Sequence, residues 1–107
     1  MASTSGRVAF TMQVKPGHVD EYRERHADVP ADLCALFRAV GIHRYSIFID
    51  GMRLFAILES EDYETARAKM TQDNTWIGWQ TSMAPLMVQM DENHSTSRLM
   101  EEVFYLE

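Results

Sequence analysis

The chain has 107 residues and a mass of 12.4 kDa, which is the size of a single domain. Sixteen acidic residues outnumber ten Lys and Arg, and the net charge of −6 argues against nucleic acid or anionic lipid as a partner. No apolar run approaches the twenty residues of a membrane span, so no membrane partner is expected. With one cysteine, Cys34, the chain has no internal disulfide and no multi-cysteine zinc site, and a cytoplasmic location is expected.

The first six residues are small and polar and lack the charged and apolar regions of a signal peptide. We therefore expect residues 1–6 to be a flexible leader and residues 7–107 to form one domain.

The first half of the domain has the pattern of a strand followed by a broken helix. Residues 7–14 alternate between apolar and polar, which predicts a half-buried strand. The charged segment 18–27 favours a helix, and Pro30 interrupts that helix or restarts it. Apolar residues at helical spacing over 33–40 predict a second helical stretch, which Gly41 is placed to cap.

The second half begins with a predicted hairpin. β-Branched and aromatic residues over 42–50 indicate a strand, and Asp50-Gly51 is a strong hairpin turn signal before a return strand over 52–59. A short helix is predicted over 61–70, followed by a helical or irregular segment over 76–90.

A last strand is predicted over residues 99–106, so the elements follow the order β-α-β-β-α-β. This is the split βαβ arrangement of the ferredoxin-like α+β class. Helices on one side leave the other face of the sheet uncovered, yet both faces of the return strand carry apolar residues, with Phe55 and Ile57 on one face and Leu54 and Leu58 on the other. We therefore expect a homodimer in which two sheets stack, a dimeric α+β barrel.

Tyr22 and His26 are the first candidates for chemistry. Their four-residue spacing places both on one face of a helix. An imidazole beside a phenol can exchange protons with a sugar or carbonyl oxygen. The alternative interpretation is a partly buried packing contact without a role in catalysis.

Aromatic residues supply the candidates for binding. Trp76 and Trp79 are three residues apart, and Tyr45 lies in the middle of a predicted strand. Aromatic rings pack on the C–H faces of sugars, although the same rings can simply fill a core. No ligand spacing indicates a metal site, and no glycine-rich phosphate loop is present, so neither a metal nor a cofactor is expected.

Several segments in order resemble the L-rhamnose mutarotase family. They are RVAFTMQVKPG (7–17), EYRERH (21–26), YSIFID (45–50), Leu54-Phe55 and EEVFYL (101–106). The resemblance extends over about residues 7–107. It implies a dimeric α+β barrel that interconverts the anomers of 6-deoxy-L-sugars without a cofactor.

The resemblance also implies roles for individual residues. The histidine of the family's first motif, the proton donor, maps onto His26, and the two substrate-contacting tyrosines map onto Tyr22 and Tyr45. The family's tandem tryptophans align with Trp79 and Gln80, so the second aromatic ring is replaced by an amide.

Two further departures concern the pocket. The family's Trp-Pro-Glu-Leu after the histidine is replaced by Pro-Ala-Asp-Leu at residues 30–33. The segment with Trp79, Gln80 and Met-Ala-Pro at 83–85 is similar to the L-fucose branch of the family, although Gly78 stands where that branch commonly has Arg. L-Fucose and L-rhamnose therefore both remain candidate substrates.

The sequence predicts a mutarotase that opens and recloses a 6-deoxy-L-hexose ring by acid-base chemistry. His26 is assigned as the acid, Tyr22 as its hydrogen-bonding partner, and Tyr45, Trp79 and Gln80 as sugar contacts; the base is not assigned. Two alternatives are a cofactor-free monooxygenase or isomerase and a non-catalytic small-molecule-binding domain, both on the same dimeric fold.

Overall fold

The computed structural model describes residues 6–90, 92 and 95–107. The predicted leader lies outside the described residues except for Gly6, whose carbonyl accepts a hydrogen bond from the Ser60 N–H at 2.9 Å. No helix in the described part of the chain is long and apolar enough to cross a membrane.

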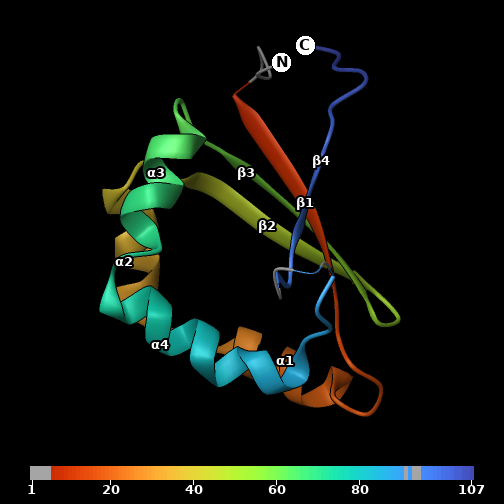
Figure 1. Cartoon of the computed structure of the whole chain (residues 1–107). Helices are drawn as coiled ribbons and strands as arrows, with labels where there is room; N and C mark the ends of the chain where they lie inside the picture. Colours follow the sequence, from red (N-terminus) through yellow and green to blue (C-terminus); the bar gives the residue numbers. More distant parts are fainter. Residues whose placement is uncertain (1–5, 91, 93–94) are drawn as a thin grey trace.

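One antiparallel sheet and an arc of helices on one side of it make up the fold (Figure 1). Its strands are β1 (Arg7–Gln13), β2 (His43–Asp50), β3 (Arg53–Glu59) and β4 (Arg98–Met100), in the order β2-β3-β1-β4. The helices are α1 (Val19–Ala27), α2 (Ala31–Ala39), α3 (Tyr63–Met70), α4 (Asn74–Met83) and the 3₁₀ turn η1 (Ala84–Leu86). The predicted ferredoxin-like α+β class is confirmed.

The predicted ends of the first helices and of the hairpin agree with the structure. Pro30 separates α1 from α2. Gly41 follows α2 at φ +95°, and the next residue, Ile42, donates its N–H to the Phe37 carbonyl at 2.8 Å. Gly51 adopts φ +63° in the turn between β2 and β3, as the Asp-Gly pair predicts.

The later helices begin at acidic caps that set their bounds. The Asp62 carboxylate accepts the Thr65 N–H at 3.2 Å, so α3 starts at Tyr63. Asp73 caps α4 by accepting the Thr75 N–H at 2.8 Å, so α4 starts before the predicted residue 76. These caps place the start of α3 two residues after the predicted residue 61 and the start of α4 two residues before the predicted residue 76.

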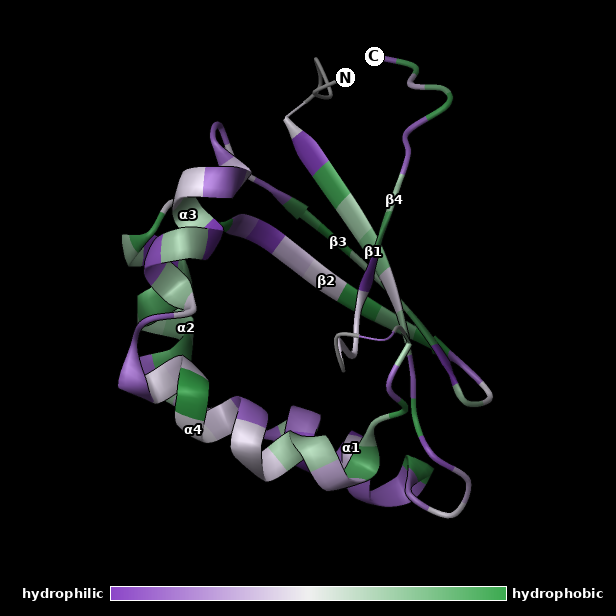
Figure 2. Cartoon of the chain, in the orientation of Figure 1, coloured by the Kyte–Doolittle hydropathy of each residue, from purple (hydrophilic) through white to green (hydrophobic). Residues whose placement is uncertain are grey.

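Alternation along the strands divides the sheet into an inner and an outer face. Leu54, Ala56 and Leu58 of β3 are buried beneath the helices, and Leu54 and Leu58 share this face as the sequence predicts. Phe55, between them, faces outward with 38% of its surface exposed, and its partner Phe48 on β2 is 63% exposed. The outer face therefore carries exposed aromatic side chains. The described helices all lie on the other side of the sheet (Figure 2).

The prediction for the last strand is wrong in length. The strand ends at Met100, the last residue of β4 that pairs with β1, and residues 101–107 have no regular structure. The register limits how far a strand could extend here, because continuing it places Glu102 opposite Arg7, where β1 begins. The Arg7 guanidinium contacts the Glu102 carboxylate at 3.0 Å and lies 3.9 Å from the centre of the Tyr105 ring. Beyond this point the described part of β1 offers no backbone to pair with.

A bulge at the start of β2 lets two side chains reach the interior. His43 pairs with Glu59 and Ser46 pairs with Ile57, so β2 carries one extra residue there. Arg44 sits in this bulge at φ +47°, which is unusual for a residue with a side chain. Because of the extra residue, the side chains of Ile42 and Tyr45 both point toward the interior. Ile42 is 2% exposed, and Tyr45 packs against the core.

Substitutions at Arg44 should test the strain in this bulge. Arg44→Gly should leave the free energy of unfolding unchanged or raise it by up to about 1 kcal/mol, because glycine adopts a positive φ without a steric penalty. Arg44→Val should lower it by about 1–2 kcal/mol, because a β-branched side chain is poorly tolerated there. Urea denaturation measures both, with Ser46→Val as a control at an exposed position past the bulge. Equal stability of the Gly and Val variants would contradict the account.

Candidate active site

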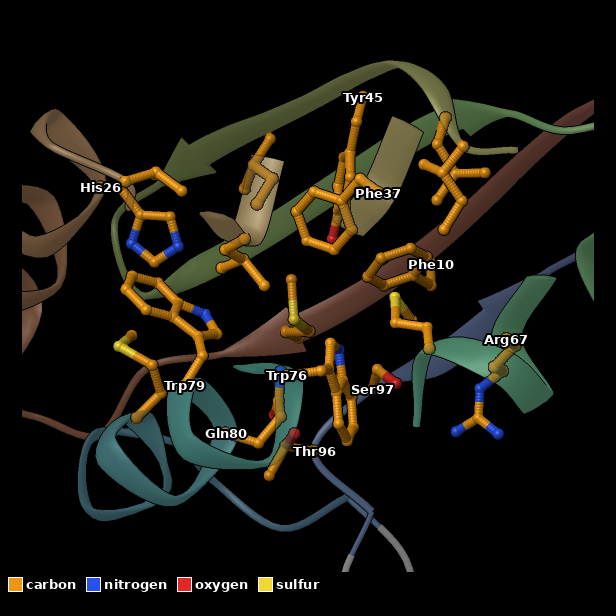
Figure 3. A pocket seen from close by; sticks show the side chains of 18 of the residues that line it. Phe10, His26, Phe37, Tyr45, Arg67, Trp76, Trp79, Gln80, Thr96 and Ser97 are labelled. Carbon is orange, nitrogen blue, oxygen red and sulfur yellow. The ribbon is translucent and has the colours of Figure 1, made fainter. Parts of the chain in front are cut away.

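A cavity of about 670 Å³ lies between the inner face of the sheet and the arc of helices (Figure 3). Side chains from all four α-helices, β1, β2 and the segment before β4 line it. Most of them are aromatic or aliphatic, and a few polar groups interrupt this lining. Such a cavity has the character of a small-molecule site.

Tyr22 and His26 are brought together by α1 as their spacing predicts. The two rings stack at 4.0 Å between centroids and 21° between planes. The Nδ1 atom of His26 lies 3.0 Å from the main-chain carbonyl oxygen of Tyr22. Tyr22 is buried and belongs to the core, and burial raises the pKa of its phenol to about 12. It therefore stays neutral and gives the imidazole a fixed surface.

Contacts between α1 and α4 bring Trp79 to His26. The indole meets the imidazole edge-on at 5.3 Å between centroids. Close by, the Arg25 guanidinium donates a hydrogen bond to the Ser82 carbonyl at 2.8 Å and contacts the Glu21 carboxylate at 2.6 Å. This ties the last turn of α1 to the last turn of α4 and fixes the separation of the two rings.

The hydrogen bond at Nδ1 defines the protonation state of His26. A carbonyl oxygen can only accept, so in the neutral imidazole the proton must lie on Nδ1 and the lone pair on Nε2. The ring edge that carries Nε2 faces the cavity (Figure 3). Burial lowers the pKa of His26, and the hydrogen bond to the Tyr22 carbonyl opposes this effect without cancelling it. The resting side chain is thus a neutral proton acceptor.

Tyr45 and Gln80 line the same cavity. Tyr45 reaches it from β2 and packs against the rings of Phe10 and Phe37, with centroids 6.1 and 5.2 Å away, and its hydroxyl points inward (Figure 3). Burial, together with neighbouring phenols, raises the pKa of Tyr45, so its hydroxyl keeps its proton. Gln80 is half-buried on α4, next to Trp79.

The structure adds lining residues that sequence reasoning did not assign. Trp76, which the sequence offered as a binding candidate without a final role, faces the cavity from the same side of α4 as Trp79. Tyr63 and Ser97 also line it, and no sequence pattern distinguished them. Burial raises the pKa of Tyr63 by more than the neighbouring Arg67 lowers it.

No group of three or more His, Cys, Asp or Glu side chains that could hold a metal ion occurs within residues 6–90, 92 and 95–107. The polar groups that do line the cavity suit hydrogen bonding to hydroxyl groups and the transfer of protons.

Comparison with known proteins gives a consistent result. A family model described as L-rhamnose mutarotase matches residues 7–106. The L-rhamnose mutarotase of Bacillus subtilis is 40% identical over 103 residues, which cover 94% of this chain and 98% of that protein. The crystal structure of the L-rhamnose mutarotase from Formosa agariphila is similar, with a TM-score of 0.79, 33% identity, and coverage of 94% of this chain and 98% of that chain.

More distant structures share the fold alone. Tetracenomycin F2 cyclase from Streptomyces glaucescens has a TM-score of 0.62 at 13% identity, with 94% of this chain and 95% of that chain covered. At this identity the likeness carries no argument about chemistry.

Proposed function

The chain belongs to the L-rhamnose mutarotase family, and on this premise we propose that it interconverts the α and β anomers of a 6-deoxy-L-hexose in the cavity beside His26. One observation supports this more than any other. The imidazole of His26 is held by a hydrogen bond from Nδ1 to the Tyr22 carbonyl, so Nε2 is unprotonated and faces the cavity, where it can accept a proton. Aromatic rings suited to the C–H faces of a sugar surround it.

Ring opening in this proposal starts with His26 as the base. Nε2 takes the proton of the anomeric hydroxyl, the bond between C1 and the ring oxygen breaks as the C1 carbonyl forms, and the ring oxygen receives a proton. Rotation about C1–C2 and the reverse steps then give the other anomer. The sequence assigned His26 as the acid; the Nδ1 hydrogen bond favours the opposite starting state, and the imidazolium returns the proton as an acid on closure.

The ring oxygen needs a donor, and we assign the Tyr45 hydroxyl. It points into the cavity and keeps its proton because burial raises its pKa. The reaction moves protons and breaks and re-forms one C–O bond without a change of oxidation state, so it requires no electron transfer and no activated group. A non-catalytic binding domain would have no use for such an acid-base pair.

His26→Gln should lower the rate of anomer exchange at least about 10²-fold while the fold is retained, because it removes the group that moves the proton. Magnetisation transfer between the anomeric protons of L-rhamnose measures the rate. Tyr22→Phe should have a smaller effect, since the backbone carbonyl that holds His26 remains. His18→Gln, at the exposed start of the same helix, is the matched control. Exchange by His26→Gln at the wild-type rate would overturn the assignment.

The pH dependence of exchange should follow the neutral form of His26. Because burial lowers its pKa below the ordinary 6.5, Nε2 stays unprotonated at neutral pH, and the catalysed rate should be flat there. The rate should fall only as acidification passes that lowered pKa, since protonation removes the acceptor. Rates measured from pH 8 to pH 5, with the uncatalysed rate subtracted, test this. A catalysed rate that rises on acidification would indicate that His26 starts as an acid.

The amide side chain of Gln80 is the reason to expect L-fucose, and not L-rhamnose, as the preferred substrate. L-Fucose carries an axial 4-hydroxyl where that of L-rhamnose is equatorial, and an amide can donate to this hydroxyl or accept from it, whereas an indole ring has no acceptor. We expect faster exchange per enzyme for L-fucose, with Gln80→Trp narrowing or reversing the preference. Exchange rates of both sugars under the same conditions decide the question, and equal rates or a wild-type preference for L-rhamnose would count against a role for Gln80.

The outer face of the sheet supports a homodimer. Phe48, Phe55 and Ile57 lie on neighbouring strands and form an apolar patch on this face. A second sheet stacked on this patch would bury its aromatic rings. The exposed Val103 and Phe104 beyond β4 add apolar surface close to the same sheet. The cytoplasmic location remains a prediction.

Phe48→Glu should convert the dimer into a monomer at micromolar concentration, because it places an uncompensated charge where two sheets would meet. Light scattering coupled to gel filtration gives the mass. Met52→Glu, on an exposed methionine in the hairpin turn, should remain dimeric. A wild-type protein that is a folded monomer of 12.4 kDa would contradict the dimer.

A further inference from the structure

Trp76 lies in the cavity with no role in the chemistry described above. It comes from α4, one turn before Trp79, and the two indoles project from the same side of the helix together with Gln80. Its ring is half-buried and packs against the core that contains Phe10 and Met70. This packing fixes the position of the indole, so Trp76 forms a rigid part of the cavity wall.

The two indoles occupy different parts of the cavity. Figure 3 shows Trp79 below His26, whereas Trp76 lies farther along, toward Phe10 and Ser97. A pyranose whose anomeric hydroxyl meets Nε2 of His26 extends away from the imidazole. Its C3–C4 edge, opposite the anomeric carbon, then lies at the Trp76 end.

The chemistry of an indole discriminates between sugars at this edge. In L-fucose the axial 4-hydroxyl leaves the hydrogens on C3, C4 and C5 on one face of the ring, which gives a continuous C–H surface. In L-rhamnose the hydrogen on C4 points to the opposite face from those on C3 and C5, so the surface is interrupted. An aromatic face packs best on a continuous apolar surface.

We propose that Trp76 is a sugar-binding residue that packs on the C3–C4–C5 face of the substrate and favours a sugar with the configuration of L-fucose. This inference rests on the proposed mutarotase function. Trp76 supplies, from another turn of α4, aromatic surface in a cavity where Gln80 replaces the second tryptophan of the family pattern.

Fluorine NMR can test the contact without relying on turnover. The chain has two tryptophans, so the full-length protein labelled with 5-fluorotryptophan should give two resonances, and Trp76→Phe identifies one of them. Titration with L-fucose should shift both resonances with the same midpoint, and L-rhamnose should move the Trp76 resonance less. A saturable shift of the Trp79 resonance with no change at Trp76 would overturn the proposal while leaving the mutarotase function intact. Failure of the proposed function itself would instead show as no anomer exchange by the wild-type protein.

Kinetics of Trp76→Leu provides a second test. Leucine keeps the core contact apolar but removes the flat surface, so the KM for L-fucose should rise about three- to tenfold, with a smaller rise for L-rhamnose. The value of kcat should change less than twofold, because Trp76 does not move a proton. Ile77→Ala, at the exposed next position on α4, is the control. If Trp76→Leu folds poorly, Trp76→Phe takes its place with a smaller expected rise. Unchanged KM values, or equal rises for both sugars, would overturn the proposal.

Discussion

The hydrogen bond between Nδ1 of His26 and the Tyr22 carbonyl is the interaction on which the site depends. It joins two residues one helical turn apart, so the helix itself determines which ring nitrogen carries the proton. Stacking on Tyr22 and the edge contact with Trp79 then hold the ring against rotation. A proton acceptor is thereby aimed into the cavity without any charged partner.

The cavity around Nε2 of His26 is formed by side chains of the inner sheet face and of the helices that cover it. Strand alternation directs apolar side chains toward the helices, and the bulge at Arg44 keeps Tyr45 among them while Ile42 fills the core. The guanidinium of Arg25 ties α1 to α4 and so brings residues distant in sequence to one wall. A largely apolar lining strengthens each polar contact with a bound sugar, because little water competes.

Much of this arrangement could be predicted from local patterns. The alternation of residues 7–14, the Asp50-Gly51 turn and the spacing of Tyr22 and His26 each reflect short-range geometry, and the structure agrees with all three. The class of fold followed from the order of the elements. For the site, the sequence offered Trp76 and Trp79 as aromatic candidates for binding, and both line the cavity.

Features that depend on distant parts of the chain could not be predicted in this way. The apolar pattern over 99–106 is typical of a strand, but the start of β1, about ninety positions earlier, limits how far such a strand can pair. Tyr63 and Ser97 enter the cavity only through tertiary packing. The protonated nitrogen of His26 is set locally within α1, but residue spacing alone does not give the side-chain conformation that brings Nδ1 to the Tyr22 carbonyl.

The tautomer of His26 tests the account most directly. Nitrogen-15 NMR of the histidine-labelled protein at pH 8, with His26→Gln to identify its signals, reports which ring nitrogen carries the proton. The account predicts a protonated Nδ1 and an unprotonated Nε2, and it predicts that both become protonated only when the pH falls below the ordinary pKa of 6.5. A proton on Nε2 at pH 8 would contradict it, because no acceptor would then face the sugar.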